Sequence, residues 1–122
     1  MVNTMTERLS IYEKLTMPEK ERIVSLSKPE GEFIYNFLKE KQIRKTLETG
    51  FAYGCSAAYI ISATKSNHYL IDPHQKSYYN NQGIKNLEAL GLIKYVKLED
   101  DFSHSALPLF RIETFLRKIR LF

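Results

Sequence analysis

The chain has 122 residues, of which 43% are hydrophobic and 26% are charged, and this length and composition are typical of one globular domain. It is too short for a doubly wound sheet of roughly six or seven strands. No stretch approaches the roughly 18 consecutive apolar residues that a membrane-spanning helix needs, which argues against a membrane span.

The formal net charge of +4 comes mostly from the C-terminal end of the sequence. Residues 1–110 carry 14 basic and 13 acidic side chains, so the body of the chain is nearly neutral. This balance makes nucleic acid an unfavoured partner. The first residues lack the apolar core of a secretory signal, and a single cysteine offers no intramolecular disulfide. Both features favour a cytoplasmic location.

The N-terminal region, residues 1–43, is predicted to consist of helices. Apolar residues at spacings of four and three indicate an amphipathic helix over residues 5–15. Pro18 should end this helix, and a short helical turn is expected to follow it through Ile23.

A further helix is predicted to begin at Ser27 and to run through Leu38. The Ser27 hydroxyl can cap free backbone N–H groups, and Pro29 is tolerated in the first turn of a helix. Glu30 is favoured there because the N-terminal end of a helix is positive.

Residues 44–108 alternate between strand and helix patterns. Strands are predicted at residues 45–49, 68–72 and 95–98, and helices at residues 54–63, 77–90 and 103–110. Gly83 lies inside the second of these helices, where it costs about 1 kcal/mol relative to alanine. The alternation predicts an α/β fold with a Rossmann-like parallel sheet, truncated to about three strands with flanking helices.

Small residues dominate the loop between the first strand and its helix, residues 48–56. Only small side chains let backbone N–H groups approach a ligand at such a turn. Ligands of open α/β sheets bind beyond the carboxyl ends of the strands, where this loop should meet Asp72, Asp100 and Asp101. Because Asp72 would lie at the tip of the second strand, it could accept hydrogen bonds from two ribose hydroxyls. The sequence therefore predicts a nucleoside-containing cofactor.

Glycine spacing distinguishes two cofactors that could use this loop. A dinucleotide such as NAD requires small residues at the first, third and sixth positions, and counting from Gly50 the sixth is Cys55, which fits poorly. The other pattern has an acid followed by small residues at steps of two. The sequence satisfies it with Glu48, Gly50, Ala52 and Gly54, where alanine replaces one glycine.

These residues resemble the class I S-adenosylmethionine-dependent methyltransferases, and within them the small-molecule O-methyltransferase branch. The resemblance extends over residues 27–108. It rests on Ser-Lys-Pro-Glu-Gly-Glu-Phe, Leu-Glu-Thr-Gly-Phe-Ala-Tyr-Gly-Cys-Ser-Ala, Ile-Asp-Pro-His-Gln, Gly-Ile-Lys-Asn-Leu-Glu-Ala-Leu-Gly-Leu and Ser-His-Ser-Ala-Leu-Pro, in that order. It implies S-adenosylmethionine as cofactor, with methyl transfer to a small-molecule oxygen nucleophile in intact relatives.

The resemblance also implies roles for individual residues. Glu48 would lie near the methionine ammonium, and Ser56 would bind the methionine carboxylate. Asp72 would hold the ribose hydroxyls, and the turn at Asp100 and Asp101 would border the adenine. The implied cofactor-binding residues are Glu48, Gly50, Ala52, Gly54, Ser56, Asp72 and Asp101.

Two positions depart from the family pattern. Thr49 replaces the aliphatic residue that usually separates the acid from the glycine, and Asp101 stands where a small residue is common. Cys55 is expected to be a small buried residue at a helix start. The histidines His68, His74 and His104 are too isolated from one another in sequence to predict a metal site.

Residues 109–122 are predicted to form a basic amphipathic tail, where the family has an aliphatic strand ending in aspartate. The resemblance therefore implies a truncated N-terminal half that is catalytically incomplete alone, and no general base can be assigned. Its first strand would be a bare sheet edge that either forms a homo-oligomer or is covered by this tail. The alternative is a non-catalytic interaction module that retains the fold and uses the tail as its contact surface.

Overall fold

The computed structural model describes residues 11–107, so the predictions for residues 5–10 and 109–122 lie outside it. Residues 11–14 are helical. The elements that follow are α2 (Glu19–Val24), α3 (Lys28–Glu40), β1 (Thr46–Thr49), α4 (Cys55–Thr64), β2 (His68–Ile71), α5 (Gln82–Ala89), the 3-10 helix η1 (Ile93–Tyr95), β3 (Val96–Glu99) and α6 (Ser103–Ala106). No helix in this part of the chain is long and apolar enough to cross a membrane.

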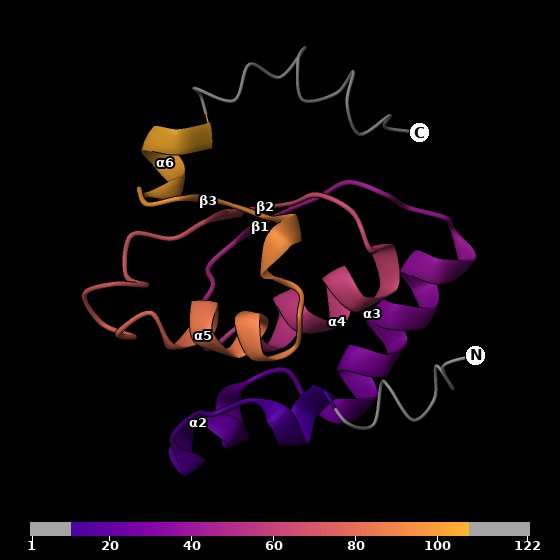
Figure 1. Cartoon of the computed structure of the whole chain (residues 1–122), viewed down its shortest axis with the longest axis horizontal. Helices are drawn as coiled ribbons and strands as arrows, with labels where there is room; N and C mark the ends of the chain where they lie inside the picture. Colours follow the sequence, from indigo (N-terminus) through magenta and orange to yellow (C-terminus); the bar gives the residue numbers. More distant parts are fainter. Residues whose placement is uncertain (1–10, 108–122) are drawn as a thin grey trace.

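The three strands form one parallel sheet in the order β1-β2-β3. This confirms the predicted Rossmann-like sheet with flanking helices. Figure 1 shows α3, α4 and α5 on one side of the strands and α6 on the other. Within the described residues β1 pairs only with β2, so its second edge has no strand beside it. Self-association through that edge stays a prediction.

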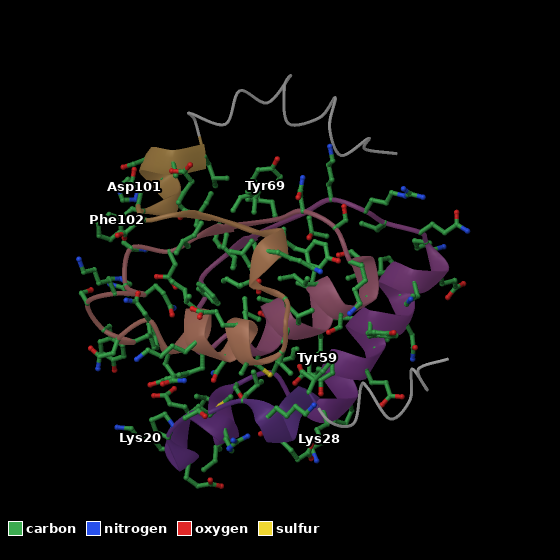
Figure 2. The ribbon with its side chains drawn as sticks, in the orientation of Figure 1. Lys20, Lys28, Tyr59, Tyr69, Asp101 and Phe102 are labelled. Atoms are coloured by element: carbon green, nitrogen blue, oxygen red, sulfur yellow. The ribbon has the colours of Figure 1, made fainter. Side chains whose placement is uncertain are left out.

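Register decides which strand side chains meet on the helix-covered face of the sheet. Thr46 lies opposite His68, and Glu48 lies opposite Leu70. Because side chains alternate along a strand, Glu48 and His68 point to the same face. His68 and Leu70 are both fully buried there. Tyr69 points to the opposite face (Figure 2).

The N-terminal helices share one hydrophobic core with the sheet, to which Ile11, Leu15 and Tyr35 contribute. α3 packs closely on α4 because Gly31 leaves room for the Tyr59 ring. A Cβ atom at Gly31 would lie 2.4 Å from that ring. The predicted start of α3 is confirmed, since Ser27 and Glu30 form a reciprocal capping box.

The predicted helix over residues 77–90 is wrong at its start, because α5 begins only at Gln82. Asn80 and Asn81 have φ values of 52° and 59°, in the left-handed region that asparagine tolerates. The turn that they form returns the chain over Gln75, whose side chain is 2% exposed. Gln75 therefore anchors a turn where helical spacing alone predicted a helix.

Candidate functional site

A cavity of about 660 Å³ opens at the carboxyl ends of β1 and β2. Residues from the β1–α4 loop, the end of β2, the start of α6 and the segment before α3 line it. Of the predicted cofactor-binding residues, it brings together Glu48, Gly50, Ala52, Ser56 and Asp72.

Alternating backbone conformations shape the β1–α4 loop. The φ angles of Gly50, Ala52 and Gly54 are 88°, 49° and 87°, so every second residue is left-handed. Glycine adopts this region without steric cost, whereas the left-handed conformation of Ala52 costs roughly 1–2 kcal/mol in conformational energy. Such alternation turns successive N–H groups inward into a concave anion-binding arrangement. The step-of-two spacing in the sequence therefore has a conformational cause.

The anion inside this loop is the carboxylate of Asp72, which is only 4% exposed. Its Oδ2 accepts hydrogen bonds from the backbone N–H of Phe51 at 2.6 Å and of Ala52 at 3.3 Å. Its Oδ1 accepts from the N–H of His74 at 2.7 Å. Asp72 thus holds the loop to the end of β2, and its predicted role toward the ribose hydroxyls stays a prediction.

Two buried amide side chains that were not among the predicted site residues hold the loop from the other side. Gln75 donates to the Ala52 carbonyl at 2.8 Å, and Asn86 donates to the Tyr53 carbonyl at 2.8 Å. Both side chains are 2% exposed. The position of Asn86 next to Leu87 in the sequence could have predicted such a role. Both residues are on the buried face of α5, where an amide without a hydrogen-bond partner would be costly.

A chain of hydrogen-bonded side chains leads from the sheet into the cavity. Ser56 donates its hydroxyl to Oε2 of Glu48. The other carboxylate oxygen, Oε1, lies 2.9 Å from Nε2 of His68. Nδ1 of His68 lies 2.6 Å from the Thr46 hydroxyl. Glu48 and Ser56 therefore present one polar, negatively charged wall to the cavity.

Aromatic side chains form part of the other walls, together with residues of α2 and of the segment before α3. Tyr53 and Tyr79 line the cavity and meet edge to face, with ring centroids 5.0 Å apart. Desolvation by burial raises the pKa of both phenols, so they stay neutral donors. His74 and Phe102 also line the cavity, and their rings meet edge to face at 5.9 Å. Phe102 is 50% exposed and offers a flat apolar surface at the rim.

Cys55 is confirmed as a small buried residue at the start of α4, with 7% exposure. Its thiol donates to the Leu26 carbonyl at 3.4 Å, and burial raises its pKa to about 11. Because only the thiolate reacts, we expect the folded chain to resist labelling by a disulfide reagent at pH 8. Denatured protein should label fully, and rapid labelling of the folded chain would contradict this description of Cys55.

No protein-family model and no curated protein sequence matches the chain significantly. Solved structures do. The O-methyltransferase TomG from Streptomyces achromogenes, solved with SAM, aligns with a TM-score of 0.67 at 16% identity, over 91% of this chain and 48% of its own. An O-methyltransferase from Bacillus cereus, solved with SAH, aligns with a TM-score of 0.63 at 16% identity, over 99% of this chain and 50% of its own.

The chain has a methyltransferase fold. A third neighbour, the SAH-bound methyltransferase PaMTH1 from Podospora anserina, aligns with a TM-score of 0.68 at 15% identity, over 91% of this chain and 47% of its own. The chain therefore spans about half the length of these three solved structures. The resemblance inferred from the sequence is confirmed at the level of the fold.

Within this methyltransferase fold, two predicted residues lie outside the cavity lining. Gly54 instead packs the loop against α5, where an added Cβ would lie 3.3 Å from the Gly83 carbonyl oxygen. Asp101 accepts a hydrogen bond from the N–H of Phe102 at 2.7 Å, and Phe102 is the residue that reaches the cavity. Figure 2 shows Asp101 and Phe102 at the start of α6. The predicted roles of Gly54 and Asp101 toward a cofactor stay predictions.

No group of three or more His, Cys, Asp or Glu side chains in residues 11–107 is arranged to hold a metal ion. The three histidines instead have other neighbours. His68 contacts Glu48, whereas His74 and His104 both contact the Phe102 ring.

Proposed function

We propose that the cavity binds S-adenosylmethionine and its product S-adenosylhomocysteine (SAH), and that the chain is the cofactor-binding part of an O-methyltransferase for a small molecule. The main observation behind this proposal is that Glu48, Ser56 and the left-handed loop line one cavity at the strand ends. Support comes from the neighbours of the same fold, which were solved with SAM or SAH. A volume of about 660 Å³ suits a ligand of this size.

The methionine end of the cofactor would lie against Glu48 and Ser56. The side chain of Glu48 is 17% exposed, so its carboxylate is mostly desolvated yet reaches the cavity. A positive ammonium beside it would form a charge-assisted hydrogen bond, which is stronger than a neutral one. Ser56 is in the first turn of α4, where the positive end of the helix favours the methionine carboxylate.

The adenosine end would lie toward His74 and Phe102. The exposed Phe102 ring offers an apolar surface against which a planar base can stack. Asp72 contributes by fixing the loop that the ribose would cross, through its bonds to Phe51 and Ala52.

Bound S-adenosylmethionine supplies an electrophilic methyl group. The residues described here would hold the cofactor by its two ends, which fixes the position of that group for an incoming oxygen nucleophile. Positioning of this kind is a large part of catalysis when two reactants must meet in line. None of residues 11–107 is assigned as a general base.

Glu48→Gln tests this assignment, because the amide has nearly the same shape but no charge. We expect calorimetric titration to give SAH binding that is weaker by about tenfold or more, since a charge-assisted hydrogen bond becomes a neutral one. Glu99→Gln is the matched control, an exposed acid at the end of β3 outside the cavity lining. It should bind SAH like the unsubstituted chain.

Two results would contradict the proposed function. One is a folded chain that binds neither S-adenosylmethionine nor SAH. The other is a heat of binding with NAD and none with SAH.

A non-catalytic interaction module remains the second candidate, and one observation favours it. Ile23 on α2 is 84% exposed, and Phe33 and Phe37 on α3 are 70% and 43% exposed with their rings stacked. Exposed large apolar side chains of this kind are common at contact surfaces. This function predicts a folded chain without cofactor affinity, so the same titration separates the two.

A further inference from the structure

His68 is a fully buried histidine for which the proposed function has no use so far. It is the first residue of β2, and its side chain faces the helix-covered side of the sheet with none of its surface exposed. Burying a polar ring at this depth is costly unless both nitrogens are hydrogen-bonded. Both nitrogens of His68 have a partner.

The two partners of His68 show which of its nitrogens must carry a proton. A carboxylate only accepts, so Nε2 carries the proton and donates to Oε1 of Glu48 at 2.9 Å. Nδ1 shares a hydrogen bond of 2.6 Å with the Thr46 hydroxyl. Cross-strand register produces this arrangement, because Thr46 lies directly opposite His68 and Glu48 lies two residues further along the same face.

These bonds fix the orientation of the Glu48 carboxylate. Oε1 is held by His68 from inside the sheet, and Oε2 is held by Ser56 from the start of α4. Without His68 the carboxylate could rotate about its last torsion, which is broad for glutamate. The orientation of a charged group matters most where it must meet a single ammonium.

We propose that His68 is a positioning residue that aims Glu48 at the amino-acid end of the cofactor. His68 does not line the cavity, so it acts only through Glu48. The site would then distinguish ligands that carry the amino-acid group from those that carry only the adenosine part. This inference rests on the proposed function and deepens it.

The test compares two ligands on three variants. SAH carries the amino-acid group, and 5′-methylthioadenosine has the same nucleoside and thioether without it. His68→Leu removes both hydrogen bonds and fills the position with an apolar side chain of comparable size. His68→Gln can restore a donor to Glu48, and Thr46→Val removes only the hydroxyl that is hydrogen-bonded to Nδ1 of His68.

We expect His68→Leu to weaken SAH binding by about tenfold, the loss of roughly one charge-assisted hydrogen bond, and to leave methylthioadenosine within about twofold. His68→Gln should recover part of the SAH affinity. Thr46→Val should weaken SAH by a smaller factor, again without changing methylthioadenosine. Circular dichroism checks that each variant is folded, and if His68→Leu is not, Thr46→Val decides.

Equal losses for both ligands would overturn the inference, because a merely structural histidine disturbs the whole site. So would unchanged SAH binding in folded His68→Leu, or in Thr46→Val if that variant alone folds. An unsubstituted chain that binds the two ligands equally would overturn it as well. If the unsubstituted chain binds neither ligand, the proposed function itself has failed, which is a separate result.

Discussion

Replacing Asp72 by alanine should destabilise the β1–α4 loop and abolish binding of SAH. The substitution leaves the backbone N–H groups of Phe51, Ala52 and His74 without their acceptor. Only the Phe51 bond is fully buried, and an unsatisfied buried donor costs about 1–3 kcal/mol, so we expect the free energy of unfolding to fall by about 1–3 kcal/mol. Urea denaturation without any ligand measures this loss.

Asp100→Ala is the matched control, since it removes an exposed acid at the neighbouring strand end. Its free energy of unfolding should change by no more than about 0.5 kcal/mol. The ligand-free experiment separates two roles of Asp72. If the carboxylate only held ribose hydroxyls, Asp72→Ala would lose SAH affinity without losing stability, and the loop role would be refuted.

Replacing Gly83 by alanine should also destabilise the protein, although helix propensity predicts the opposite. Alanine is favoured over glycine by at most about 1 kcal/mol in a helix, and Gly83 is the second residue of α5. An added Cβ at Gly83, however, would lie 2.5 Å from the Ala52 carbonyl oxygen and 2.8 Å from both Gln75 Oε1 and Phe51 Cε1. Overpacking against backbone costs about 1–3 kcal/mol, and we expect this effect to dominate.

Thermal denaturation shows whether Gly83→Ala lowers or raises the stability of the protein. Titration with SAH should also show weakened binding, because the backbone that the new Cβ contacts belongs to the β1–α4 loop. Glu88→Ala, an exposed position in the same helix, controls for propensity. A variant of Gly83 that is more stable than the unsubstituted chain would mean that α5 and the loop do not approach as closely as described.

Local patterns in the sequence were sufficient for much of the fold. The start of α3 at Ser27, the three strands and the glycine loop were predictable because each depends on residues close together in the chain. The start of α5 was not, because helical spacing cannot reveal that a buried Gln75 and two left-handed asparagines turn the chain first.

The candidate site was predictable only in part, for a related reason. Glu48 and Ser56 were identified from one loop, and the structure places both on the same cavity. His68 looked isolated in the sequence because its partner, Glu48, lies on a different strand. Strand register brings the two together, and no sequence spacing encodes that register. The loop-holding bonds of Asp72 escaped prediction in the same way.

The most direct test of the central claim is an NMR titration of the ¹⁵N-labelled chain with SAH. If the cavity at the strand ends binds the cofactor, the largest amide shift changes should fall on residues 50–56 and 102–103. Amides around a second hollow, which is lined by residues of the segments 38–44 and 63–66 at the other end of the sheet, should stay unchanged. A folded chain whose spectrum does not respond to SAH, or responds only around that second hollow, would contradict the claim.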